Sequence, residues 1–281
     1  SLGVHVSKVR SLTLDSWEPE LVKVMCMLGN RVVNSFYEEV PDPSVARPTA
    51  HSSRAEREAW IRAKYVERRF VSKFGASTSA TAAIAPGKCL RWWVGEWVGP
   101  ASDPPAGAPP HRPLLEAASR GDVAAMAAAI ARGADVNSTS PGGERRSPLI
   151  EAAIAGSLVS CEFLLQNGAN VNHRDAHGKA ALHHATYLGH TGLVCLFLKR
   201  GANRRAVDED GNDPLSIAVT AANADIVTLL RLAKMNDEMR ESDGPYGQQG
   251  DETFQDIFRD FSHLASHEPD RLNRRDRNLQ Q

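Results

Sequence analysis

The segment Pro148-Leu149-Ile150-Glu151-Ala152-Ala153 has three counterparts elsewhere in the chain. They are Pro113-Leu114-Leu115-Glu116-Ala117-Ala118, Ala181-Leu182-His183-His184-Ala185-Thr186 and Pro214-Leu215-Ser216-Ile217-Ala218-Val219. The four segments start 35, 33 and 33 residues apart. A second marker follows at the same intervals, as Gly133-Ala134, Gly168-Ala169 and Gly201-Ala202. Two markers that share their intervals indicate internal repeats.

The residues of one unit predict a pair of short helices. Pro148 suits the first turn of a helix, where no backbone N–H is needed. Gly156 suits the end of that helix, because glycine tolerates the left-handed conformation. The second helix has a buried stripe of large apolar residues, Leu158, Phe163, Leu164 and Leu165. A period of 33 residues with this arrangement is typical of ankyrin repeats.

The expected fold class is mainly α, because a stack of such units buries a core that no single unit could bury. The predicted units cover about 113–140, 147–179, 180–212 and 213–240. The terminal units are atypical, as capping repeats are. The first has an alanine-rich second helix from Val123 to Ala131, and the last has Ala222 in place of the glycine.

Composition excludes several other classes of protein. The 281 residues have 33 basic and 34 acidic side chains and a formal charge of -1, which argues against a nucleic-acid binder. The sequence has no run of 18 apolar residues, so no membrane-spanning helix is expected. The first six residues do not resemble a signal peptide. The chain lacks a starting methionine, which suggests a fragment. The scattered thiols of Cys26, Cys89, Cys161 and Cys195 predict reduced cysteines without a zinc site.

Three histidines of the third unit, His183, His184 and His190, allow two interpretations. A metal site is one, but a fourth ligand at suitable spacing is missing. The structural interpretation is favoured because His183 falls on the signature histidine of the repeat.

The first 74 residues differ in character from the repeats. Val4 to Leu14 predicts at least one strand. Asp15-Ser16 offers a helix N-cap and Pro19 a first-turn residue. One helix with apolar residues from Leu21 to Phe36 is expected, followed by a second helix at about 53–73. This second helix is locally basic, which indicates either a solvated face or a site for phosphate or an acidic partner.

Specific runs in this part resemble the second half of an ArfGAP domain. They are Ser1-Leu2-Gly3-Val4-His5, the run from Ser7 to Trp17, Leu28-Gly29-Asn30 and the run from Glu58 to Val66. With the repeats behind them, the chain resembles Arf GTPase-activating proteins of the ACAP (centaurin-beta) group, which have BAR, PH, ArfGAP and ankyrin parts in that order. The resemblance implies the α/β C-terminal half of an ArfGAP domain at 1–74 and an Arf-family GTPase as partner. It also implies that the protein is a regulator of a GTPase rather than an enzyme, and that it acts in membrane traffic. The resemblance further implies a cytoplasmic protein that is peripheral at endosomal membranes and associates with them through upstream domains.

The match begins at Ser1, and this decides the expected activity. In the resembled domain, a four-cysteine zinc finger and an arginine finger precede the position of Ser1. An arginine finger contributes about 10³–10⁵ to the rate of GTP hydrolysis. We therefore expect zinc in the longer protein and no catalytic, cofactor or metal residue on this chain, which alone should be inactive.

The remaining segments predict a linker and a tail. Residues 75–112, rich in proline, glycine and alanine, predict a disordered linker. Its Trp-rich segment 90–98 is either a docking motif or a collapsed insertion. The tail, 241–281, contains an amphipathic pattern at 251–264 that predicts a helix packed against the stack.

Two functions fit these observations, and they are compatible. One is Arf GTPase activation, and the alternative is an ankyrin scaffold that binds proteins without that activity. An independent enzyme is disfavoured, since no phosphate loop or nucleophile motif is present. The expected partner-binding residues lie at the hairpin tips, although each taken singly also fits a solvated turn: Arg174, His177, Lys179, Arg204, Arg205, Asp208, Asp210 and Asn212.

Overall fold

A computed structural model describes residue 15 and residues 17–72 and 112–242. These residues are helical, and their one β pairing is an isolated bridge between Arg174 and Ala180. The predicted helical solenoid is confirmed for the repeats, within residues 112–242. The expected strand within 4–14, nearly all of the linker and the tail helix at 251–264 lie outside the described residues.

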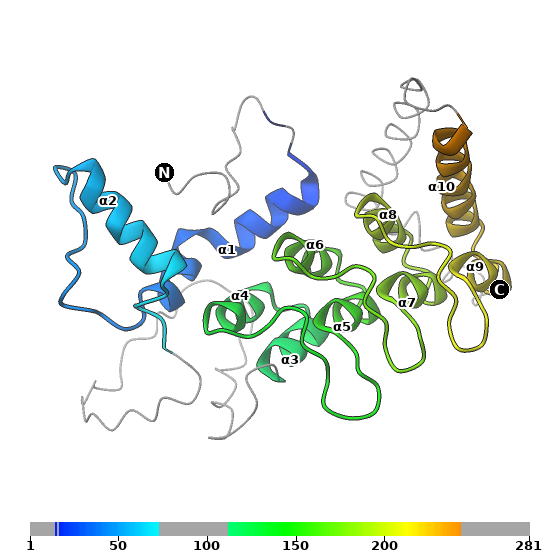
Figure 1. The fold of residues 1–281 in the computed structure, drawn as a ribbon, viewed down its shortest axis with the longest axis horizontal. Helices are drawn as coiled ribbons and strands as arrows, with labels where there is room; N and C mark the ends of the chain where they lie inside the picture. The colour runs from blue at the N-terminus through cyan, green and yellow to red at the C-terminus, as the bar shows by residue number, and fades with distance from the viewer. Residues whose placement is uncertain (1–14, 16, 73–111, 243–281) are drawn as a thin grey trace, which may run out of the picture.

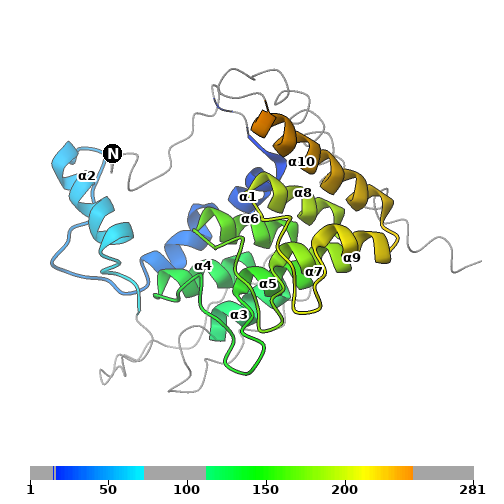
Figure 2. The same cartoon turned by 45° about the vertical axis from the view of Figure 1, so that its right-hand side comes forward.

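The repeats are four pairs of helices, stacked side by side (Figure 1). Helices α3, α5, α7 and α9 form one layer and α4, α6, α8 and α10 form the other, as both views show (Figure 2). The pairs are α3 Arg112–Arg120 with α4 Val123–Ala131, α5 Pro148–Ile154 with α6 Leu158–Gln166, α7 Ala181–Tyr187 with α8 Thr191–Lys199, and α9 Pro214–Thr220 with α10 Ala224–Ser242.

Local sequence explains where these helices begin and end. Pro148 starts α5, and the hydroxyl of Ser147 accepts a hydrogen bond from the backbone N–H of Ile150 at 3.3 Å. Gly189 follows α7 with a φ of 78°. Ala222 holds the matching position after α9 with a φ of 55°, which a β-carbon makes costly.

The core follows the signature positions of the repeats. The leucines Leu114, Leu149 and Leu182 are 0%, 1% and 0% exposed. The small alanines beside them are also buried and let neighbouring helices approach closely, as Ala117, Ala118, Ala152, Ala153 and Ala185. Each fully buried leucine contributes about 1.5–3 kcal/mol relative to an exposed one.

Asparagines link the loops of successive repeats. Asn137 accepts a hydrogen bond from the N–H of Asn170 at 2.8 Å and donates to the carbonyl of Gly168 at 3.2 Å. One repeat further on, Asn172 does the same with Asn203 at 2.7 Å and Gly201 at 3.3 Å. These bonds give hydrogen-bond partners to backbone N–H and carbonyl groups of the loops, which have no helix or sheet to pair them.

The N-terminal part has helix α1 Pro19–Tyr37, interrupted at Gly29, then α2 Arg54–Ile61 and a π-helical turn, η1 Arg62–Val66. Pro19 opens α1 as predicted, but Glu18 is the N-cap, so the assignment of Asp15-Ser16 was wrong.

The expected helix at 53–73 is also corrected, because helical structure ends at Val66. Arg68 has a φ of 52°, and Phe70 and Val71 turn into the protein with 2% and 6% exposure. The start is as the sequence suggests, with Ser53 and Glu56 forming a capping box.

Helix α1 packs against the outer helices α4 and α6 of the stack. Val24 joins the core of the repeats, and Phe36 packs with Val71 and Ala131. Arg68 donates hydrogen bonds to the carbonyls of Ile130 at 2.9 Å and Ala131 at 3.3 Å. The alanine-rich second helix of the first repeat is therefore covered by α1, which accounts for its lack of a polar outer face.

Candidate partner-binding groove

A groove of about 680 Å³ lies between α7, α9 and the loops that precede them. Four of the predicted tip residues line it, Lys179, Asp208, Asp210 and Asn212. It is also lined by His183, His184, Tyr187, Leu188, Ile217, Thr220 and Ala221. This volume falls within the range of sites that bind small molecules or single side chains of a partner.

Apolar side chains at the ends of α7 and α9 contribute much of the groove. Tyr187 is 68% exposed and Leu188 is 36% exposed. Ile217 and Ala221 of the next repeat line the same hollow. Sequence reasoning missed Tyr187, Leu188 and Ile217. Their signal was large apolar residues within three positions of the buried Ala185 or Ala218.

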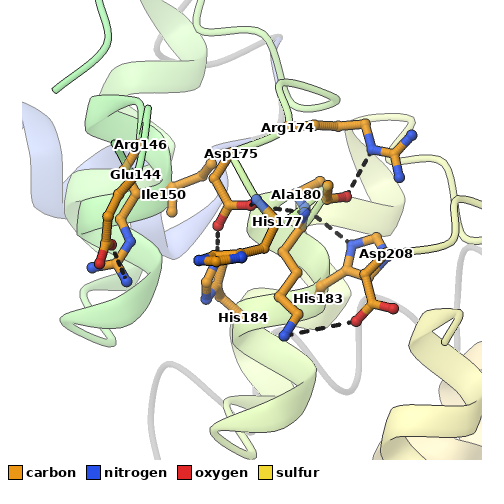
Figure 3. A network of polar contacts seen from close by, with 12 residues as sticks. Glu144, Arg146, Ile150, Arg174, Asp175, His177, Ala180, His183, His184 and Asp208 are labelled. Atoms are coloured by element: carbon orange, nitrogen blue, oxygen red, sulfur yellow. Dashed lines mark hydrogen bonds and ion pairs between the residues drawn. The ribbon is translucent and has the colours of Figure 1, made fainter. Parts of the chain in front are cut away.

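One wall is a turn organised by the buried carboxylate of Asp175 (Figure 3). One oxygen accepts hydrogen bonds from the N–H groups of His177 and Lys179, both at 2.9 Å. The other lies 2.8 Å from Nε2 of His184. Burial acts to raise the pKa of Asp175, but the hydrogen bonds from His184 and Lys179 outweigh it and hold that pKa below its ordinary value.

The next loop repeats this arrangement around Asp208. Its carboxylate accepts hydrogen bonds from the N–H groups of Asp210 at 3.1 Å and Asn212 at 2.8 Å. The Nζ atom of Lys179 lies 3.7 Å from Asp208 and 3.9 Å from Asp210. A single cation thus faces two carboxylates across the groove.

His183 is a structural residue that joins the start of α7 to the loop between α8 and α9. Its Nδ1 accepts a hydrogen bond from the N–H of Ala180 at 3.2 Å, so its Nε2 donates to the carbonyl of Ala206 at 2.9 Å. Burial lowers the pKa of His183, which keeps the ring neutral.

His190 is also explained by packing rather than by metal binding. A β-carbon on Gly156 would lie 3.0 Å from Cε1 of His190, so the ring packs directly on that glycine. Burial lowers its pKa as well. In the part of the chain that the structure describes, no three His, Cys, Asp or Glu side chains are grouped to hold a metal ion.

The remaining predicted residues lie outside the groove. Arg174 donates from Nε to the carbonyl of Gly178 at 2.7 Å and also to the carbonyl of Val207, which ties one loop to the next. His177 lies 3.5 Å from Glu209 at the loop tips.

The two arginines of the last loop are separate from these tips. Arg204 binds Asp237 at 2.6 Å and its side chain is 10% exposed. It lines a second hollow of about 310 Å³ together with Arg205, Lys234 and three others. The eight predicted residues therefore do not form one site.

The cysteines described in the structure do not form the zinc site that the family resemblance implies for the longer protein. Cys161 and Cys195 are buried in α6 and α8, and Cys26 is exposed on α1. Among the described residues no group of three or more His, Cys, Asp or Glu side chains gathers around any of the three, so these cysteines do not fit a zinc ion. Within the same residues, no helix has the length and apolar character needed to cross a bilayer.

Comparison with known proteins assigns a family to each of the two parts. Residues 1–74 match the family described as a putative GTPase activating protein for Arf, and residues 114–205 match ankyrin repeats in three copies. The chain therefore carries an ArfGAP segment followed by ankyrin repeats.

The relatives combine the same two parts. The chain is 50% identical over 330 residues to "Arf-GAP with coiled-coil, ANK repeat and PH domain-containing protein 2" of Gallus gallus and 49% identical over 328 residues to that of Homo sapiens. Each alignment covers 98% of this chain and 42% of the relative. It is also 54% identical over 107 residues to protein 3 of this series from Homo sapiens, covering 38% of this chain and 12% of the relative. The chain thus spans about two fifths of the length of the curated relatives that it matches across nearly its whole length.

Proposed function

We propose that this chain is part of a protein that activates GTP hydrolysis by an Arf-family GTPase, with repeats that bind a protein partner. The observation that carries the proposal is identity of about half over 98% of the chain to named Arf-GAP proteins. The packing of α1 on α4 and α6 supports it, because the ArfGAP segment and the repeats then act as one body. Such a protein is a regulator of a GTPase rather than an independent enzyme.

The catalytic contribution is expected from the resembled segment that precedes the position of Ser1. An arginine finger stabilises the charge that develops on the transferred phosphoryl group. A structural zinc ion decides whether a small domain around it folds. We propose that residues 1–281 position the GTPase or other partners and leave the chemistry to that segment.

A GTP-hydrolysis assay tests this proposal with two proteins. The longer protein, with the zinc-finger segment, should accelerate hydrolysis by an Arf protein by at least 10³-fold. Residues 1–281 alone should leave the intrinsic rate unchanged. If the longer protein has no effect on any Arf protein, the proposal is wrong.

The alternative is a protein-binding scaffold without GTPase activation, and the groove between α7 and α9 favours a binding role. Exposed Tyr187 and Leu188 in a hollow are typical of interaction sites. A GTPase assay on the longer protein separates the two functions, since both predict partner binding by the repeats.

Further features rest on the family resemblance alone. We propose BAR and PH parts and a zinc site in the longer protein, domain limits at 1–74 and 113–240, and action in membrane traffic at endosomes. Metal analysis of the purified longer protein and imaging of its tagged form in cells test these features. Zinc-free protein that still activates Arf would contradict the zinc site.

A further inference from the structure

The groove between α7 and α9 has an apolar surface that nothing in the described chain covers. Tyr187 and Leu188 are exposed large apolar side chains at the C-terminal end of α7, and Ile217 of α9 lines the same hollow. An aromatic residue that is 68% exposed in a hollow of about 680 Å³ offers a partner side chain a large contact at little entropic cost.

The walls of the groove are organised before any partner binds. Asp175 is held by two backbone N–H groups and by His184, and His183 is fixed between Ala180 and Ala206. Because these polar groups already have their hydrogen bonds, a partner does not have to order them. Such preorganisation lowers the entropic cost of ordering side chains when a partner binds.

The charge of the groove is set by the loop at 208–213. Two carboxylates of this loop, Asp208 and Asp210, line the groove, whereas Glu209 lies 3.5 Å from His177 and Asp213 lines the second hollow. Lys179 is the one lysine or arginine of the groove and faces both lining carboxylates at 3.7 and 3.9 Å, which leaves a net negative charge at the rim. The side chain of Asp210 is 74% exposed, so a partner can reach it from solvent.

We propose that this groove binds a protein segment that presents a large apolar side chain next to a lysine or arginine. The apolar side chain packs on Tyr187, Leu188 and Ile217, and the cation meets Asp210. The inference rests on the partner-binding role proposed for the repeats and adds the chemistry of the partner. Acidic segments and anionic membranes are disfavoured, because both would bring negative charge to a rim that is already negative.

Fluorescence anisotropy with three panels of labelled twelve-residue peptides tests the inference on the whole 281-residue chain. The first panel has a central Leu or Phe flanked by Lys and Arg. The second replaces the basic residues with Glu, and the third replaces the central residue with Ser. The first panel should bind at least tenfold more tightly than either of the others.

Three variants locate the binding. Asp210→Lys should weaken the first panel at least tenfold, and Tyr187→Ala should do the same. Glu144→Gln is the matched control, because Glu144 lies on another loop, is about half exposed and does not line the groove. Thermal unfolding checks that each variant is folded.

Several outcomes would overturn the inference. These are equal binding of the acidic panel, tight binding that survives both groove substitutions, binding to vesicles of phosphatidylserine in place of peptides, or no binding by any panel. The GTPase assay of the longer protein is read separately. A failure here with normal GTPase activation removes this site only, whereas binding without GTPase activation removes the activity proposed above.

Discussion

His183 Nε2 donates a hydrogen bond to the carbonyl of Ala206 at 2.9 Å, from α7 to the loop that connects α8 with α9. The same ring accepts from the N–H of Ala180 at its own helix N-terminus. Both bonds need a neutral ring of one tautomer, since a protonated ring could not accept from Ala180. The contact therefore makes the attachment of the α8–α9 loop to α7 depend on pH.

We expect the stack to lose stability as pH falls below about 6.5, the ordinary pKa of histidine. Burial lowers the pKa values of His183 and His190 in the folded protein, so the unfolded chain takes up these protons first. Their stabilising contribution is present above the unfolded pKa and is lost as pH falls through the folded pKa. Urea unfolding between pH 7.5 and 5.5 measures the change. His190→Ser, which copies Ser157 of the preceding repeat, should reduce the pH dependence, and an unchanged slope would contradict this explanation.

Ala222→Gly should stabilise the repeats by about 0.5–1 kcal/mol, because residue 222 has a φ of 55° that glycine adopts without strain. The reciprocal change Gly189→Ala should destabilise, since its φ is 78° and its β-carbon would lie 3.4 Å from Asn223 Nδ2. Chemical denaturation of both variants gives the two free energies. The same sign for both would show that local φ does not control these positions.

Phe36→Ala should destabilise the joint between the ArfGAP segment and the repeats by about 3–5 kcal/mol. Phe36 is 5% exposed and packs with Val71 and Ala131. Hydrogen exchange should rise in α1 and α4 and change little in α9. Val22→Ala is the control on the same helix, because Val22 is 42% exposed and its truncation should cost little. Equal exchange in both variants would mean that α1 does not support α4.

Leu182→Ala should reduce the stability of the protein, whereas Leu188→Ala should reduce peptide binding, although both leucines belong to the third repeat. Leu182 is fully buried, so its truncation should cost about 2–5 kcal/mol of unfolding free energy. Leu188 lines the groove and is 36% exposed, so its truncation should leave the unfolding midpoint nearly unchanged and weaken the basic peptides. Calorimetry and anisotropy of both variants measure the two effects. A large loss of stability in the Leu188 variant would place it in the core instead.

Sequence reasoning predicted the stack well because each unit has its own local signals. Proline begins α5 and α9, glycine follows α5 and α7, and the signature leucines of the first three units are buried. It placed the end of the second N-terminal helix too late. The apolar spacing beyond Val66 belongs to a turn at Arg68 that packs on α4, and helical periodicity cannot distinguish the two.

The candidate site was predicted only in part, and the reason is geometric. Lys179, Asp208, Asp210 and Asn212 belong to the loops that the repeat pattern exposes, and they line the groove. Arg204 and Arg205 looked equivalent in the sequence, but the loop directs them to a second hollow, where Arg204 is paired with Asp237. Tyr187 and Leu188 became site residues only when α7 and α9 lay side by side.

By itself, the sequence determined the number and order of the repeats, the helix starts and the buried leucines, since these depend on residues close together in the chain. The tertiary structure decided which outer face α1 covers, which loop charges meet across the groove and which apolar residues stay exposed. Those properties depend on residues far apart in the chain, such as Phe36 with Ala131 and Lys179 with Asp208, whose proximity results from packing. A pattern of nearby residues carries no information on the distance between residues far apart in the chain, so these contacts could be found only in the folded protein.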